Sequence, residues 1–218
     1  MAITVPSQVK DPERIRERRM QIIAAAVQLF AEKGFHKTTT REIAKMSGLS
    51  NGALYEYVES KEDVLFLVCE HIHREVETNL RQSLSEAAKG SVRLEHAITS
   101  FLHVIERMQV EVLLIYQESK SLPAPYLHEV LAREQAITGI FEQLLTEARA
   151  DGTIRIEESA IPILAHDIVV SGQMWAYRRW ALKTISFESF VQQQVAMLMR
   201  ACQGDVTTST SGCSTQSR

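Results

Sequence analysis

The chain has 218 residues, of which 45% are hydrophobic and 23% are charged, and this composition is typical of a globular protein with a buried core. No apolar run reaches the roughly 18 residues needed to span a bilayer and the N-terminus carries no signal-peptide pattern, so we expect a cytoplasmic protein without a membrane partner. The net charge is −3, but residues 1–61 contain ten Lys and Arg against seven Asp and Glu, which leaves −6 on residues 62–218 and favours a small phosphate-facing module on an acidic body.

Helical periodicity extends over most of the chain. Apolar residues recur at steps of three and four, and no stretch alternates strictly between apolar and polar residues. This pattern predicts an all-α fold of about nine helices. The first helix is expected at about 12–33, where Gly34 provides a C-terminal stop.

Three helix start signals follow the first helix. Thr39 and Glu42 form a capping box that begins one short helix. Ser50 begins a second short helix in the same way, and Ser60 begins a long helix that ends near Gly90. Further helices are expected at about 91–107, 109–118, 125–149, 157–182 and 186–202.

The segment from Thr40 to Tyr57 has the spacing of a helix-turn-helix. Ala44 stands where the two helices cross most closely, and Gly48 stands at the turn, where a positive φ costs little only without a Cβ. Apolar residues that would set the angle between the helices are Ile43, Leu49 and Leu54. The second helix then turns small or polar residues outward, namely Ser50, Asn51, Gly52, Ala53, Tyr55 and Tyr57.

This outer surface suits the major groove of DNA. Small residues let a helix enter the groove, an Asn amide reads base edges, and Tyr hydroxyls and the N–H groups at a helix start suit phosphates. Lys61 would add a positive charge at the start of the next helix, where the helix dipole already favours an anion. The alternative is a small three-helix bundle with Tyr55 and Tyr57 packed on its surface.

The stretch from about 19 to 68 resembles the DNA-binding domain of the tetracycline-repressor (TetR/AcrR) family of transcriptional regulators. The matching residues, in chain order, are Ile23-Ala24-Ala25-Ala26, Leu29-Phe30, Lys33-Gly34-Phe35, Thr38-Thr39-Thr40, Ile43-Ala44, Ser47-Gly48-Leu49-Ser50, Gly52-Ala53-Leu54-Tyr55 and Ser60-Lys61-Glu62-Asp63. Val58 departs from the family pattern, which usually has Phe there. The resemblance implies a homodimer through the last two helices, a palindromic operator, and DNA contacts at Thr40, Arg41, Ser50, Asn51, Gly52, Ala53, Tyr55, Tyr57 and Lys61.

With this resemblance the chain divides into four expected parts. They are a flexible N-terminal arm at 1–12, a helix-turn-helix domain of three helices at 13–60, an effector-binding and dimerisation domain at 61–203, and a disordered tail at 204–218. The tail is rich in Ser and Thr and has too little apolar content to offset its ordering entropy. We expect an effector to wedge between the helices of the larger domain and to shift the 61–86 helix like a lever.

An apolar cavity is expected in the larger domain. Aromatic and Met side chains are typical of adaptable pockets. The candidate lining residues are Phe101, Ile105, Met108, Leu113, Tyr116, Phe141, Leu145, Met174, Trp175, Tyr177 and Arg178. Plain core packing is the alternative for each of them.

Two arginines and two tryptophans interrupt the otherwise apolar run from Gln173 to Trp180. Arg178 and Arg179 suit a carboxylate or phosphate, and the alternatives are an ion pair at a dimer interface or stacking on tryptophan. This run and the run from Ser60 to Val68 are similar to regulators of fatty-acid and acyl-CoA metabolism within the family. That similarity implies a fatty acyl or acyl-CoA effector.

The last helix carries a wide apolar face, which needs a partner helix to cover it. Pairing with the helix near 161–182 and with the symmetry mates of both would give a four-helix dimer interface. The expected interface residues are Ile161, Ile168, Trp180, Phe187, Phe190, Val191, Val195 and Leu198.

The alternatives to a DNA-binding regulator are an enzyme and a helical scaffold that does not bind DNA. His71 and His73 point about 200° apart around a helix and cannot share a metal there. His96 and His103 share a face but suit solvated or core positions better than a metal site. Motifs of hydrolases and phosphate loops are absent from the sequence, and the three cysteines lack zinc-site or disulfide spacing, so we expect no catalysis, metal or cofactor.

Overall fold

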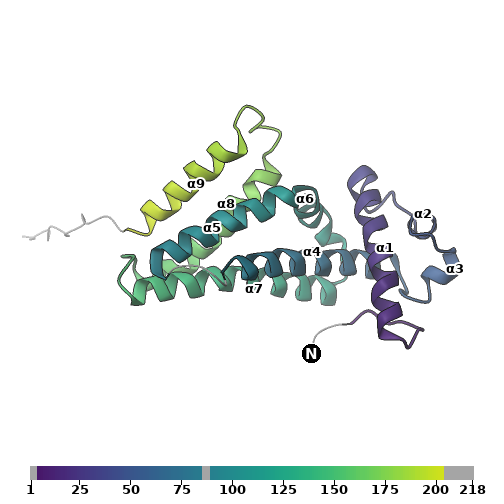
Figure 1. Ribbon diagram of the computed structural model, residues 1–218. Helices are drawn as coiled ribbons and strands as arrows, with labels where there is room; N and C mark the ends of the chain where they lie inside the picture. Colours follow the sequence, from purple (N-terminus) through teal and green to yellow (C-terminus); the bar gives the residue numbers. More distant parts are fainter. Residues whose placement is uncertain (1–3, 85–88, 204–218) are drawn as a thin grey trace, which may run out of the picture.

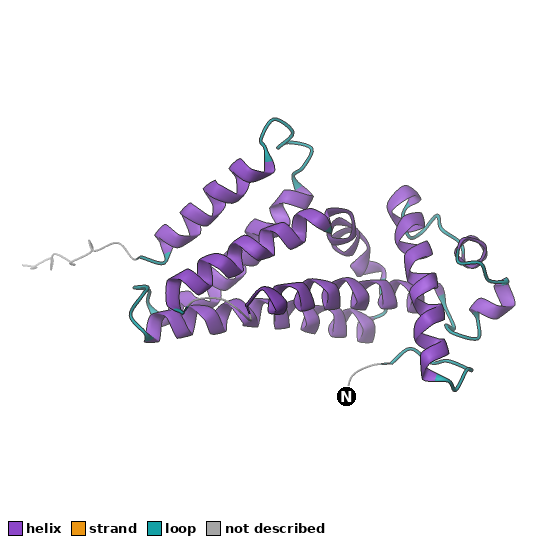
Figure 2. Cartoon of the chain, in the orientation of Figure 1, coloured by secondary structure: helices purple, strands orange, loops and turns teal. Residues whose placement is uncertain are grey.

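The computed structural model describes residues 4–84 and 89–203. Within these ranges the chain consists of helices and loops, without strands, which confirms the predicted all-α class (Figure 2). The helices are α1 (Pro12–Lys33), α2 (Thr40–Met46), α3 (Asn51–Leu54), α4 (Lys61–Leu84), α5 (Gly90–Arg107), α6 (Gln109–Glu118), α7 (Ala124–Ala150), α8 (Ile161–Tyr177) and α9 (Phe187–Ala201). Short 3₁₀ turns stand at Ser119–Ser121 and Glu158–Ala160. The tail expected at 204–218 lies outside the described residues.

The predicted start signals act as helix caps. The Thr39 side chain accepts from the Glu42 N–H and the Glu42 carboxylate accepts from the Thr39 N–H, which completes the capping box. The Ser50 hydroxyl accepts from the Ala53 N–H at 3.0 Å, and the Ser60 hydroxyl accepts from the Asp63 N–H at 3.0 Å. These bonds satisfy N–H groups that have no partner within the helix.

One helix is shorter than its apolar pattern predicts. The pattern covers 157–182, whereas α8 runs from Ile161 to Tyr177. Pro162 stands in its first turn, where a missing N–H costs nothing, so it favours a start at this point. Beyond Tyr177 the residues form turns.

Two hydrophobic cores share α4. Its first half, from Val64 to Ile72, packs with α1–α3 and with three residues from the other part of the chain, Leu114, Leu122 and Val130. Its second half contributes Val76 and Leu80 to the core formed with α5, α7, α8 and α9. In Figure 1, α4 runs from α1 along α7 into the larger helical body. The division between the two cores therefore lies inside α4, and not at the expected domain boundary of 60/61.

The described part of the N-terminal arm, for which the sequence predicts flexibility, packs against α1 and the end of the helix-turn-helix. Val5 is 6% exposed and belongs to the N-terminal core. The Gln8 N–H donates to the Glu56 carbonyl at 2.9 Å. The Arg19 guanidinium donates to the carbonyls of Val5, Pro6 and Tyr57. Arg19 thereby ties the arm to the end of the helix-turn-helix.

Candidate DNA interface and effector cavity

The helix-turn-helix has the geometry that its sequence predicts. Ala44 is 1% exposed where α2 meets α3, and the Leu49 N–H donates to the Ala44 carbonyl at 2.9 Å. Gly48 adopts a φ of +71°, which a residue with a Cβ adopts only under strain. Figure 1 places α2 and α3 at the end of the molecule opposite α9. The short helices therefore form an accessible tip.

The tip exposes small and polar side chains. The exposed residues are Arg41, Ser50, Asn51, Gly52 and Tyr55, and Thr40 and Ala53 are half-buried. The hydroxyls of Tyr55 and Thr40 lie 3.1 Å apart, so a residue of α2 and one that follows α3 are joined at the surface. These groups can hydrogen-bond to bases and phosphates in a groove.

An ion pair holds α2 against α1. The Lys33 ammonium contacts the Glu42 carboxylate, which also takes part in the capping box. The hydrogen bonds from Lys33 and then from Thr39 lower the pKa of Glu42 to about 2. Glu42 therefore stays ionised and keeps α2 in place near neutral pH.

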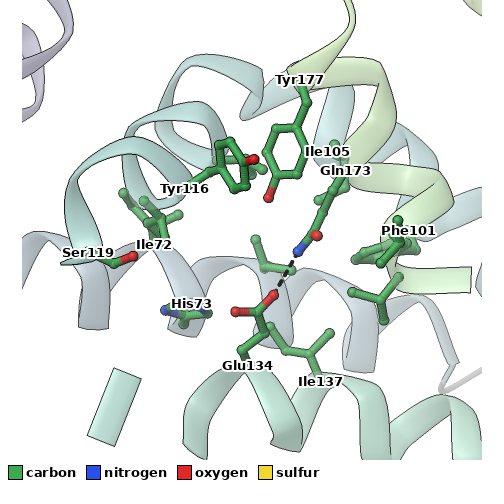
Figure 3. Close-up of a pocket in the computed structure, with 15 residues that line it drawn as sticks. Ile72, His73, Phe101, Ile105, Tyr116, Ser119, Glu134, Ile137, Gln173 and Tyr177 are labelled. Carbon is green, nitrogen blue, oxygen red and sulfur yellow. Dashed lines mark hydrogen bonds between the residues drawn. The ribbon is translucent and has the colours of Figure 1, made fainter. Parts of the chain in front are cut away.

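A cavity of about 430 Å³ lies between α4, α5, α6, α7 and α8 (Figure 3). Its lining is mainly apolar and consists of Ile72, His73, Val76, Phe101, Ile105, Val112, Ile115, Tyr116, Ser119, Glu134, Ile137, Val169, Val170, Gln173 and Tyr177. Gly172 lets the Phe101 ring come close to α8, because a Cβ at Gly172 would lie 2.5 Å from that ring. A mainly apolar cavity with a few polar groups is typical of a small-molecule site.

Polar side chains gather in one part of the cavity. The Gln173 amide donates to Glu134 Oε1 at 3.0 Å, and the Tyr116 and Tyr177 rings stack with centroids 4.2 Å apart. Burial, and then the charge of Glu134, raises the pKa of Tyr177. Burial lowers the pKa of His73, whose Nδ1 lies 2.9 Å from the Cys69 carbonyl. Both tyrosine and histidine are therefore neutral near pH 7.

Two family models match the chain. The first describes bacterial regulatory proteins of the tetR family and matches residues 22–68. The second describes a tetracyclin repressor-like C-terminal domain and matches residues 87–178. Together they cover more than half of the chain. The chain belongs to the TetR family.

Curated relatives of this TetR-family regulator are also transcriptional regulators. The HTH-type transcriptional regulator HbdR of Aromatoleum sp. (strain CIB) is 29% identical over 199 residues, which are 91% of this chain and 86% of that protein. The fatty acid metabolism regulator protein of Bacillus subtilis (strain 168) is 26% identical over 143 residues, which are 64% of this chain and 72% of that protein. The resemblance inferred from residues 19–68 is confirmed.

Solved structures share the fold. The Bacillus subtilis regulator FadR in complex with stearoyl-CoA has a TM-score of 0.71 at 21% identity, covering 84% of this chain and 98% of that one. AibR in complex with isovaleryl coenzyme A and operator DNA has the same TM-score, identity and coverage. At these identities the likeness establishes the arrangement of the helices.

Two residues that were expected to contact DNA make contacts within the chain instead. Tyr57 is 2% exposed, because α3 ends at Leu54 and the turn that follows brings Tyr57 into the core. The Lys61 ammonium donates to the carbonyls of Phe35 at 2.9 Å, Thr38 at 3.0 Å and His36 at 3.4 Å. These carbonyls account for its three N–H groups, so Lys61 clamps α4 to the loop between α1 and α2.

Four expected cavity residues line the cavity, namely Phe101, Ile105, Tyr116 and Tyr177. Phe141 lies behind Phe101, with ring centroids 5.3 Å apart, and Trp175 packs on Phe187 and Phe190. The remaining expected residues outside the lining are Met108, Leu113, Leu145, Met174 and Arg178. Met174 and Arg178 line a second hollow. The others, except the half-buried Leu113, pack in or against a hydrophobic core, which was the alternative to a place in the cavity.

Sequence reasoning missed several apolar residues of the lining and four polar ones, which are Glu134, Gln173, His73 and Ser119. A signal was present for Glu134, because it stands three residues before Ile137 and seven before Phe141, on the inward face of α7. A charged residue on such a face indicates a cavity or a buried partner.

The second hollow lies between α8 and α9 and shares Tyr116, Val170 and Tyr177 with the cavity. The Arg178 guanidinium lies 4.9 Å from the Trp180 ring centroid, and Arg179 lies 4.6 Å from that of Trp175. Both arginines stack on tryptophan, which was the alternative to anion binding. Arg178 nevertheless remains exposed at the edge of this hollow.

Most expected interface residues face the core of their own chain. Ile161, Ile168, Phe190, Val195 and Leu198 are each at most 8% exposed, and Phe187 and Val191 pack against the same core. Trp180 is exposed as expected, at 65%. The apolar residues that α8 and α9 present to solvent are instead Ile163, Val170 and Met197.

The described residues contain no group of three or more His, Cys, Asp or Glu that could hold a metal ion. None of their helices is long and apolar enough to cross a membrane.

Proposed function

We propose that this chain is a dimeric transcriptional repressor that binds operator DNA through α2 and α3 and releases it when an acyl-CoA enters the cavity. The observation that carries the proposal is the position of α4. Its residues Ile72, His73 and Val76 line the cavity, while Val64–Cys69 form part of the core of the DNA-binding helices. A ligand that displaces α4 in the cavity therefore also displaces the α2–α3 tip.

Small displacements suffice for release. A dimer reads two half-sites about 34–36 Å apart, so a few ångströms of change in the separation of the two tips costs contacts. The effector must bind the DNA-incompetent state more tightly than the DNA-bound state, because equal affinity shifts no equilibrium. We infer that its activity is binding and not catalysis, and that it acts in the cytoplasm, where operator DNA lies.

The cavity and the second hollow together suit an acyl-CoA. The apolar cavity accepts an acyl chain, and the stacked Tyr116 and Tyr177 stand between it and the hollow. Arg178 at the hollow offers a guanidinium for the phosphates of coenzyme A. Two proteins of the same fold have structures with acyl-CoA molecules, which supports this class of effector.

Dimerisation is proposed through α8 and α9. Ile163 on α8 is 65% exposed and lies outside the lining of the second hollow, and Trp180, also 65% exposed, adds a large ring nearby in sequence. A second copy that covers this face would bury apolar surface and set the spacing of the two tips.

The test uses DNA from the promoter region of the protein's own gene. Fluorescence anisotropy should show saturable, sequence-specific binding that weakens at least tenfold when acyl-CoAs of several chain lengths are added. Free coenzyme A is the matched control and should leave binding unchanged. A scaffold or an enzyme would bind neither the promoter nor any DNA with specificity, and that result would refute the proposal.

A further inference from the structure

Glu134 is the one carboxylate among the described residues that line the cavity, and no Lys or Arg of the described chain lines it. One carboxylate oxygen accepts from the Gln173 amide at 3.0 Å. Figure 3 shows the other oxygen turned toward the side of the cavity where His73 lies. This second oxygen has no hydrogen-bond donor within the described chain. The carboxylate therefore has room for a donor from a ligand.

The neighbouring groups do not supply that donor. His73 uses its Nδ1–H for the Cys69 carbonyl at 2.9 Å, and burial keeps the ring neutral, so Nε2 is left as an acceptor. The Gln173 amide nitrogen is already engaged with Glu134, which leaves its oxygen as an acceptor too. The hydroxyls of Tyr116, Tyr177 and Ser119 also line the cavity, but within the described chain none of them is hydrogen-bonded to Glu134. The second carboxylate oxygen is therefore open to a donor that a ligand brings.

The charge of Glu134 limits which ligand groups are tolerated. A free carboxylate beside Glu134 would place two like charges in an apolar cavity, where they repel strongly. An ammonium group would be attracted but would lose far more hydration free energy than a hydroxyl on entering. A hydroxyl donates to the carboxylate at a small desolvation cost, and a hydrogen bond to a charged acceptor is stronger than one between neutral groups.

We propose that Glu134 selects effectors whose acyl portion carries a hydroxyl group and that it excludes free carboxylic acids from the cavity. This inference rests on the proposed function, because it takes an acyl-CoA as the effector. It adds the functional group by which the protein distinguishes one acyl thioester from another. Glu134 is the specificity-determining residue, and Gln173 holds it in position.

The first experiment uses isothermal titration calorimetry on the chain with its natural sequence. The probes are octanoyl-CoA, 3-hydroxyoctanoyl-CoA, 8-hydroxyoctanoyl-CoA, octanoate and octylamine. At least one hydroxylated thioester should bind about tenfold or more tightly than octanoyl-CoA, and octanoate should show no binding. Equal affinities for the three thioesters, or tightest binding of octylamine, would overturn the inference while leaving acyl-CoA regulation intact. Absence of binding by every thioester would instead remove the proposed effector class and this inference with it.

The second experiment repeats the titrations with Glu134→Gln, which keeps the shape of the side chain and removes its charge. The preference for the hydroxylated thioester should fall below threefold, and octanoate should begin to bind. Glu142→Gln, a change on the same helix at a position outside the cavity lining, should keep the natural preference. A Glu134→Gln protein with the natural preference would refute the role of Glu134. Should its thermal melting show an unfolded protein, the ligand series on the natural chain decides alone.

Discussion

The Glu118 carboxylate accepts a hydrogen bond from the backbone N–H of Phe35, with an oxygen-to-nitrogen distance of 3.2 Å. Glu118 is the last residue of α6, and Ile115 and Tyr116 on the same helix line the cavity. Phe35 lies in the loop between α1 and α2. This bond joins the cavity wall to the DNA-binding helices without passing through α4, and it adds to the connection that α4 itself makes.

Glu118→Ala should weaken the coupling between effector and DNA. Removing the carboxylate cuts a connection that bypasses α4, so we expect the effector-induced loss of operator affinity to shrink about three- to tenfold. Anisotropy titrations with and without acyl-CoA measure this ratio. Glu111→Ala, in the first turn of the same helix, is the control and should keep it. An unchanged ratio in Glu118→Ala would mean that the Glu118–Phe35 bond does not carry the signal.

Lys61→Ala should destabilise the fold more than it affects the electrostatics of DNA binding. The ammonium holds three backbone carbonyls and lies 4.3 Å from the Phe35 ring centroid, so its loss should reduce the free energy of unfolding by about 1–3 kcal/mol. The slope of log affinity against log salt should stay as it is. Urea unfolding and a salt series of operator titrations test both statements.

Arg41→Ala should have the opposite effect to Lys61→Ala, because it should change DNA binding and leave stability unchanged. Arg41 is exposed on α2, so its removal should leave the unfolding curve unchanged while the salt slope falls by about 0.9, as for one lost phosphate contact. If instead Lys61→Ala lowered the slope and Arg41→Ala did not, the assignment of these two residues would have to be exchanged.

Local features of the sequence predicted the local structure well. The caps at Thr39, Ser50 and Ser60 and the turn at Gly48 depend on residues within one helical turn, and the structure has all of them. Tyr57 was misplaced because the pattern gives no sign that α3 ends at Leu54. A turn instead of a helix there changes the direction of every following side chain.

Features that depend on which helices pack together were predicted poorly. The apolar face of α9 is evident from its periodicity, but Val195 and Leu198 turn out to cover their own chain. The cavity position of Glu134 requires α7 to pack beside α8, where Gln173 meets it. Helical periodicity specifies a face and does not specify the partner of that face.

His73 should make stability depend on pH below about 6.5. Burial lowers its pKa in the folded chain, whereas in the unfolded chain it titrates near 6.5. As the pH falls below 6.5 the unfolded state binds more protons than the folded state, so the free energy of unfolding decreases until the folded pKa is reached. Urea unfolding between pH 5 and 8 should show this decrease, and His73→Gln should reduce it.

The control for this pH effect is His166→Gln, because His166 is exposed on α8. This variant should follow the natural chain through the whole pH range. A His73→Gln protein with the same pH profile as the natural chain would show that His73 titrates alike in both states.

The exposed apolar face of α8 and α9 gives the sharpest test of the proposed dimer. Ile163 is 65% exposed on α8, and on α7 Leu131 is 53% exposed, so the two positions tolerate a polar side chain equally well within one chain. Ile163→Asp should therefore leave the melting of the monomer fold little changed but should shift sedimentation toward the monomer, because a buried unpaired charge at an interface is strongly unfavourable. Operator affinity should fall with it, since one tip contacts one half-site. Leu131→Asp should remain dimeric and bind the operator normally, and a monomer produced by Leu131→Asp but not by Ile163→Asp would place the interface on α7.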